Sequence, residues 1–222
     1  LIKASKKFWF WYWTQLMNGF APSDLEGNYI RPKGIKVSRE YKINSDKGQI
    51  YLLVGNSCPW CHRTLLIYTI KNLFEKVKII SLKADIEHGE WIFNKNFKGC
   101  IRLSDFYKKA NKNDIYRATL PLLISIENDA IKILSNESSQ IIKLLNTLKN
   151  ELKNQSLNIK NCDQKILDLI HYEINDGVYR CGFARNQLSY EKANKSLFTA
   201  LNWIENKINK NKGNWICGEN LT

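Results

Sequence analysis

Apolar residues between positions 48 and 82 follow two different periods. The run at 50–54, Ile-Tyr-Leu-Leu-Val, is short and continuous, which is typical of a buried strand. Residues 59–74 carry apolar side chains at helical spacing, and a second apolar run begins at Val77 and reaches Leu82. A strand, a helix and a strand in this order predict a crossover unit with two parallel strands.

A further group of apolar runs follows a long polar stretch. The runs at 122–126 and 131–134 are separated by Glu-Asn-Asp-Ala, which favours a hairpin. A helical pattern comes next, and Asn136 is expected to be its N-cap. The order βαβ and then ββα, with a Cys-x-x-Cys at the start of the first helix, is typical of a thioredoxin-like domain.

Beyond about residue 155 the strand patterns disappear. Segments 166–179 and 190–208 have the apolar period of helices. We therefore predict an α/β thioredoxin-like domain at 46–150, followed by an all-α domain at 151–222. The last five residues, Gly-Glu-Asn-Leu-Thr, resemble the start of another helix, so the helical domain is expected to be truncated.

Residues 1–45 are predicted to form an N-terminal arm with an unusual aromatic cluster. Six consecutive aromatic residues, Phe8 to Trp13, follow Lys6 and Lys7. Trp and Lys favour a membrane interface, but aromatic residues also bury well against a folded body. A run of six lacks the one-sided pattern of an interfacial helix, so we expect these side chains to pack against the rest of the protein.

The net charge of +13 arises from lysines that are scattered along the chain. No basic run is long enough to predict a nucleic-acid or membrane-surface patch, and no stretch of 18 apolar residues predicts a membrane span. Six cysteines in 222 residues are too sparse for a small disulfide-rich secreted scaffold. The chain is therefore expected to act in the cytoplasm, with mostly free thiols and without nucleic-acid or membrane partners.

The motif at residues 58–63, Cys-Pro-Trp-Cys-His-Arg, lies where the first strand ends and the first helix begins. Pro59 suits a first helical position, which places Cys58 at a helix N-terminus. Unpaired N–H groups and the helix dipole stabilise a thiolate there, and the thiolate is the reactive form of cysteine. Cys61, one turn later, is either a resolving thiol or a buried bystander.

Metal and haem sites are disfavoured by the remaining residues. Cys-x-x-Cys-His also satisfies the pattern for covalent haem attachment, but no export signal precedes it and the only methionine, Met17, lies in the arm. A zinc site would need a second paired cluster, which is missing. The other four cysteines are expected to be core residues: Cys100, Cys162, Cys181 and Cys217.

Four ordered strings, at residues 57–65, 89–93, 136–139 and 175–184, resemble the glutathionyl-hydroquinone reductases, the Xi class of glutathione transferases. The resemblance implies a glutathione transferase fold and removal of glutathione from glutathionyl-hydroquinones. Cys58 would form a mixed disulfide with glutathione, and Tyr179 would assist the leaving phenolate. The implied glutathione-binding residues are Trp91, Arg117, Leu120, Pro121, Glu137 and Ser138.

Within that resemblance, Pro121 is expected to be cis and to leave the backbone of Leu120 free to pair with glutathione. Glutathione is implied as co-substrate, and a homodimer as the assembly. Two other functions stay open: a dithiol glutaredoxin-like oxidoreductase that uses Cys58 with Cys61, and a non-catalytic binding module with a glutathione transferase fold.

Overall fold

The computed structural model describes residues 2–32, 34, 48–110, 117–148, 162–210 and 215–217. The chain divides into two compact units. One unit combines Leu1–Lys33 with Leu157–Thr222, and the other is Gly34–Ser156. The N-terminal segment thus groups with the C-terminal helices, although the sheet separates them in the sequence.

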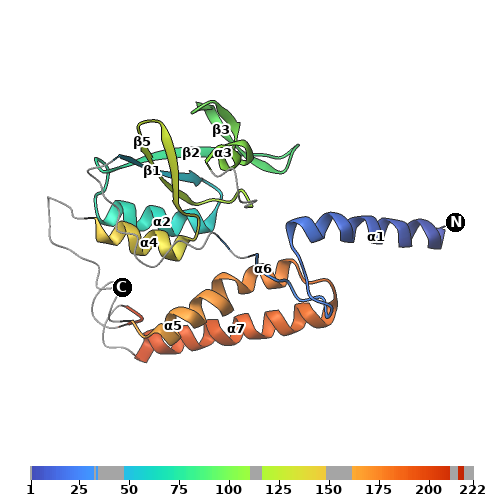
Figure 1. Cartoon of the computed structure of the whole chain (residues 1–222). Helices are drawn as coiled ribbons and strands as arrows, with labels where there is room; N and C mark the ends of the chain where they lie inside the picture. Colours follow the sequence, from blue (N-terminus) through green and yellow to red (C-terminus); the bar gives the residue numbers. More distant parts are fainter. Residues whose placement is uncertain are drawn as a thin grey trace. The chain divides into compact units, whose positions relative to one another are not determined.

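The unit at 34–156 is built on a six-stranded mixed sheet in the order β4-β3-β2-β1-β5-β6 (Figure 1). The strands are β1 (Gln49–Gly55), β2 (Val77–Asp85), β3 (Glu90–Phe97), β4 (Cys100–Arg102), β5 (Leu122–Glu127) and β6 (Ala130–Ser135). Strands β1 and β2 pair in parallel, and the other pairs are antiparallel. The predicted crossover between the first two strands is confirmed.

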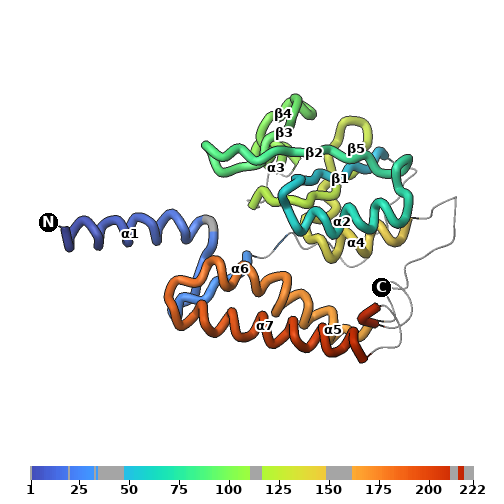
Figure 2. Tube along the Cα trace, turned by 180° about the vertical axis from the view of Figure 1, so that it is seen from behind, coloured from blue at the N-terminus to red at the C-terminus, as the bar shows by residue number. Residues whose placement is uncertain are grey.

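Two helices, α2 (Pro59–Ile70) and α4 (Ser138–Thr147), lie side by side against the sheet (Figures 1 and 2). The side chains of Leu53, Ile124, Ile141 and Leu145 are fully buried in this unit. Burial of this apolar area supplies most of the free energy that holds helices on a sheet. The core therefore rests on the continuous apolar runs that the sequence showed.

The predicted hairpin between β5 and β6 is confirmed. Its turn residues Asn128 and Asp129 have φ angles of 45° and 62°, which match a tight turn that suits the twist of two paired strands. Helix α2 ends at Ile70, four residues earlier than predicted. Asn72 follows with a φ of 50°, a left-handed conformation that stops a helix.

The long polar stretch before residue 122, for which the sequence pattern predicts no helix or strand, is structured in part. It contains β3, β4 and the helix α3 (Leu103–Ala110). In β3 three successive polar residues at 94–96 are exposed, and Phe93 is the single buried position. The alternation that marks a half-buried strand is therefore missing, which explains why the sequence did not reveal it.

The other unit is helical. Its elements are α1 (Ile2–Phe20), α5 (Gln164–Leu169), a π-helical segment (Ile170–Asn175), α6 (Gly177–Gly182) and α7 (Gln187–Lys210). The π-helical segment and α6 both pack along α7 (Figure 2). Among the described residues, no helix has the length and apolar character needed to cross a membrane.

The segment at 21–31 is hydrogen-bonded to the helical part of this unit. The Arg185 guanidinium donates to the carbonyl of Ala21 at 2.8 Å, and the Ser189 hydroxyl donates to the carbonyl of Glu26 at 3.0 Å. Arg31 pairs with Asp176 at 3.2 Å. An arm that packs against the folded body is therefore present, but it begins after the aromatic cluster.

The aromatic cluster itself contradicts the prediction. The six side chains from Phe8 to Trp13 are between 38% and 66% exposed. Their rings contact one another, with centroids 6.0 Å apart for Phe8 and Trp11. A run of aromatic residues without a one-sided pattern does not reveal whether any surface lies opposite the helix that carries it.

Two of the predicted free core cysteines are paired instead. Cys162 and Cys217, which are 55 positions apart in the sequence, form a disulfide with their Cα atoms 5.1 Å apart. Cys100 is buried and Cys181 half-buried, and both are free thiols. Sequence spacing does not specify which cysteines meet, so the pairing could not be read from it. The helix start predicted at 218–222 lies outside the described residues.

Candidate functional site

Cys58 is the N-cap of helix α2, as predicted. Its backbone is extended (φ −94°, ψ 112°), and Pro59 is the first residue of the helix. The Cys58 carbonyl accepts hydrogen bonds from the N–H groups of Cys61 and His62 at 3.0 and 3.1 Å. The Cys58 N–H donates to the carbonyl of Gly55 at 3.0 Å, which forms the turn between strand and helix. The half-buried sulfur therefore stands at the positive end of the helix dipole, where a thiolate is favoured.

Cys61 is fully buried, one helical turn beyond Cys58. Its sulfur accepts the N–H of Gly55 at 3.3 Å. A hydrogen bond with the Cys58 thiol, together with burial, raises the pKa of Cys61 far above its usual value. Cys61 therefore stays a neutral thiol at physiological pH, and Cys58 is the more accessible thiol of the pair.

A backbone edge faces the Cys58 sulfur. The Leu120–Pro121 peptide bond is cis, as expected, and the Leu120 carbonyl lies 3.7 Å from the Cys58 sulfur. One residue earlier, the buried Tyr107 hydroxyl donates to the carbonyl of Thr119 at 2.8 Å. Burial raises the pKa of Tyr107 to about 12, so the hydroxyl keeps its proton and remains a donor.

Glu137 and Ser138 form the start of helix α4. Glu137, rather than the predicted Asn136, is the N-cap, with extended backbone angles of −99° and 117°. The Glu137 N–H donates to the Ser135 hydroxyl at 3.0 Å, which takes the chain out of β6 into the helix. A helix start with a buried hydroxyl suits a carboxylate.

Arg63 connects the two helix starts. Its guanidinium donates to the Ser138 hydroxyl at 3.3 Å and lies 5.6 Å from the ring centre of Trp60. Burial lowers the pKa of Arg63, but an arginine retains its charge at any physiological pH. This cation therefore adds a positive charge between the thiol of α2 and the hydroxyl of α4, an environment suited to an anionic ligand.

Trp91 lies close to the turn that carries Cys58. A Cβ added at Gly55 would meet the six-membered ring of Trp91, so the indole packs on the Gly55 backbone. Because Gly55 accepts the N–H of Cys58, this contact places Trp91 beside the thiol segment. The predicted site residues Cys58, Trp91 and Leu120 are thus brought together within one unit.

The other two predicted site residues, Arg117 and Tyr179, are described by their own surroundings. Arg117 is exposed at the beginning of the segment that leads to Pro121. Tyr179 lies in α6 of the helical unit, where the Arg31 guanidinium stands 5.8 Å from its ring centre and Phe183 packs at 6.2 Å. The placement of Arg117 and Tyr179 at the site stays a prediction.

Sequence reasoning missed three supports of the site: the glycine under Trp91, the hydroxyl of Tyr107 and the contact between Arg63 and Ser138. Gly55 follows an apolar run, and in the sequence it indicates only where the strand ends. Tyr107 lies in the stretch where no helix was predicted. Arg63 and Ser138 are 75 residues apart, and only the fold brings such positions together.

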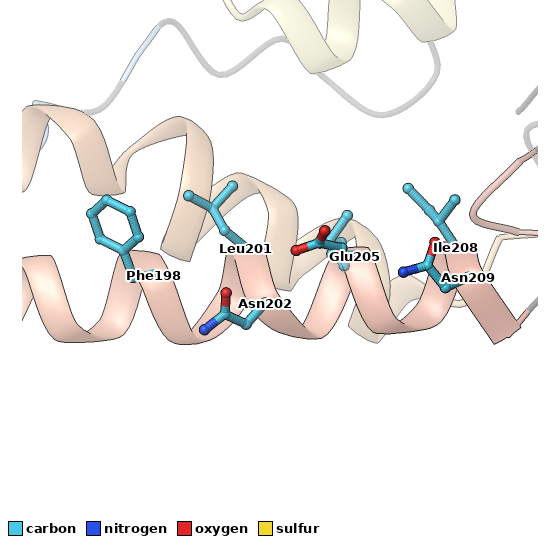
Figure 3. Close-up of a pocket in the computed structure, with 7 residues that line it drawn as sticks. Phe198, Leu201, Asn202, Glu205, Ile208 and Asn209 are labelled. Atoms are coloured by element: carbon cyan, nitrogen blue, oxygen red, sulfur yellow. The ribbon is translucent and has the colours of Figure 1, made fainter.

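A groove of about 470 Å³ lies along helix α7 (Figure 3). Its apolar side chains recur at helical spacing on one face and come from Phe198, Leu201, Ile204 and Ile208. It contains neither a thiol nor a cation that would suit glutathione. Among the described residues no group of His, Cys, Asp and Glu side chains could hold a metal ion.

The chain resembles known proteins in sequence and in structure. It is 30% identical over 193 residues to the glutathionyl-hydroquinone reductase PcpF of Sphingobium chlorophenolicum, which covers 81% of this chain and 60% of that protein. The chain spans between 57% and 64% of the length of the first three curated relatives it matches. No protein-family model matches it.

Solved structures extend the likeness to the fold. The Xi glutathione transferase of Phanerochaete chrysosporium superposes with a TM-score of 0.74 and 25% identity, over 90% of this chain and 69% of that one. The glutathione-bound structure of YqjG, a glutathione transferase homologue from Escherichia coli K-12, matches with a TM-score of 0.65 and 27% identity, over 80% and 61%. By sequence and by fold, the chain is a relative of the glutathionyl-hydroquinone reductases, the Xi class of glutathione transferases.

Proposed function

We propose that this chain carries the catalytic thiol of a glutathione-dependent enzyme that reduces glutathionyl-hydroquinones to hydroquinones. The observation that carries the proposal is the 3.7 Å separation between the Cys58 sulfur and the backbone of Leu120. A peptide that pairs with Leu120 like a short strand brings its own sulfur to Cys58. The Arg63 cation and the Ser138 hydroxyl then receive the carboxylate of the γ-glutamyl end, and the Glu137 carboxylate receives its ammonium group.

The reaction has two thiol steps. The Cys58 thiolate attacks the sulfur of the glutathionyl thioether, a Cys58–glutathione disulfide forms, and the carbon–sulfur bond breaks. Its electron pair stays with the ring carbon, which takes up a proton to give the hydroquinone. A second glutathione thiolate then attacks the mixed disulfide, frees Cys58 and leaves as glutathione disulfide. In the net reaction the thioether sulfur and one glutathione thiol become glutathione disulfide, and the ring carbon exchanges its bond to sulfur for a bond to hydrogen.

Other parts of the proposal concern the whole protein. Tyr179 donates a hydrogen bond to an oxygen of the departing hydroquinone, or supplies the proton that the ring carbon takes up. Trp91 and Arg117 line the glutathione site. The protein acts as a homodimer in the cytoplasm, and glutathione and glutathionyl-quinones are its small-molecule partners.

Incubation with glutathionyl-menadiol tests the proposal, with mass spectrometry of the protein and chromatography of the released menadiol. We expect one glutathione adduct, on Cys58, and its removal by added glutathione. Cys58→Ser should lower turnover by at least about 10³-fold, because the nucleophile is lost. If the native protein forms no adduct and releases no menadiol, the enzyme hypothesis is rejected in favour of a non-catalytic binding module.

The hydrogen bond between the Cys58 and Cys61 thiols favours a second candidate, a dithiol oxidoreductase. In that mechanism Cys61 attacks the mixed disulfide, glutathione leaves, and a Cys58–Cys61 disulfide forms. The burial of Cys61 and its raised pKa oppose this step, because the attacking group must be a thiolate. Cys61→Ser decides the matter: unchanged turnover supports the one-cysteine cycle, and its loss supports the dithiol one.

A further inference from the structure

Helix α1 presents a large apolar surface to solvent. Phe8, Trp9 and Phe10 are 66%, 65% and 63% exposed. Contiguous exposed patches of this kind are rare on monomeric proteins and mark sites of interaction. The helix ends in the part of the chain that is held firmly, since the Arg185 guanidinium lies 5.1 Å from the Trp13 ring and binds the Ala21 carbonyl.

The helix has two faces that the run of aromatic residues conceals in the sequence. Ile2, Trp9, Trp13 and Leu16 recur at intervals of seven, four and three, so they share one face of an α-helix. Lys3, Lys7, Thr14 and Asn18 recur at intervals of four, seven and four and share a second face, on which Trp11 also lies. Ile2 and Leu16, outside the aromatic run, thus lie on one face, whereas the six consecutive rings point to all sides of the helix.

The charge of the helix indicates the chemistry of its partner. The basic residues Lys3, Lys6 and Lys7 lie in the first two turns and are exposed, and α1 contains no acidic residue. The chain as a whole carries a net charge of +13. Trp and Tyr rings prefer the boundary between lipid headgroups and acyl chains, and lysines beside them bind anionic headgroups.

We propose that α1 is a docking helix for an anionic lipid surface, where it lies in the headgroup region without spanning the bilayer. The aromatic side chains insert between acyl chains, and the three lysines contact anionic headgroups. This proposal departs from the prediction that the protein has no membrane partner. It is independent of the thiol chemistry, because none of the residues in α1 belongs to the candidate site.

Vesicle flotation of the native protein tests the proposal, with vesicles of phosphatidylcholine alone and of phosphatidylcholine with phosphatidylserine. We expect flotation with the mixed vesicles, and weakening as salt is added. Phe8→Ala/Trp9→Ala should weaken the partition by at least about tenfold, because two large apolar groups are lost. Lys3→Gln/Lys6→Gln/Lys7→Gln should weaken it about 100-fold on the mixed vesicles and little on phosphatidylcholine alone.

Trp203→Ala is the matched control, because it removes a tryptophan that is 41% exposed on α7. It should float like the native protein, and circular dichroism should show that all variants are folded. The proposal is overturned if the native protein does not float, or if the α1 variants float equally well. It is also overturned if those variants dissociate a dimer in sedimentation while no vesicle binds, because the helix is then a protein–protein contact.

Discussion

Helices α2 and α4 begin without a side-chain cap, whereas helix α5 begins with one. The Asp163 carboxylate accepts the N–H of Lys165 at 2.9 Å at the start of α5. The N-caps Cys58 and Glu137 have the same extended backbone as ordinary caps, yet neither side chain accepts an N–H of its own helix. The two helix starts in the candidate site are therefore not capped by their own N-cap side chains, whereas α5 is.

The strongest way to break this comparison is to remove the cation between the two open helix starts. Under the proposed function, Arg63→Gln should weaken glutathione binding about 30-fold, because a charge-assisted hydrogen bond to the carboxylate is lost. Titration calorimetry measures the affinity. Arg102→Gln is the control, since this exposed arginine pairs with Glu90 and Asp105 and should leave affinity unchanged. Equal effects of the two variants would contradict a role for Arg63.

A second test enlarges the glycine beneath Trp91. Gly55→Ala places a methyl group against the indole ring and should lower the free energy of unfolding by about 1–3 kcal/mol, because Trp91 or the strand must move. Gly182→Ala is the matched control, since nothing lies within 4 Å of the added atom. It should change stability by no more than about 1 kcal/mol. Chemical denaturation compares the two, and a tolerated Gly55→Ala would contradict the packing of Trp91 on this turn.

The contribution of the buried Tyr107 hydroxyl to stability can be tested by varying the pH. The raised pKa of Tyr107, about 12, means that folding favours its neutral form. Its contribution to stability is therefore complete below pH about 10, where an unfolded tyrosine is still neutral, and is lost as pH rises to about 12. We expect a loss of about 2 kcal/mol over that range in denaturation experiments. Tyr107→Phe should flatten the profile, and an equally steep profile in the variant would contradict this assignment.

The smallest effects distinguish the two kinds of helix start directly. Asp163→Ala should lower the free energy of unfolding by about 1 kcal/mol and leave glutathione affinity unchanged, because only a cap is lost. Ser138→Ala should weaken glutathione binding about tenfold, because a hydrogen bond to the ligand is lost. Thermal unfolding and calorimetry on both variants give the four values. If Asp163→Ala also weakened binding, the distinction between open and capped helix starts would fail.

What could be predicted from the sequence was local. The position of Cys58 follows from the strand run before it and from Pro59 after it, and both signals lie within a few residues of the thiol. The hairpin after Leu122 was equally local. Contacts such as Arg63 with Ser138, or Cys162 with Cys217, join positions 75 and 55 residues apart and depend on the path of the chain. The exposure of Phe8 to Trp13 is of the same kind, because burial depends on what lies opposite.

Helices α2 and α4 are also tied at their far ends. The Lys71 ammonium, just beyond α2, donates to the carbonyls of Asn146 and Leu148 at 2.5 and 2.9 Å, at the end of α4. Arg63 joins the N-terminal ends of the two helices, and Lys71 joins their C-terminal ends. Neither helix can therefore slide past the other without breaking a hydrogen bond from a cationic side chain. The distance between the Cys58 thiol of α2 and the Ser138 hydroxyl of α4 is thereby held constant. A ligand that must contact both the thiol and the hydroxyl is therefore selected by its length as well as by its chemistry.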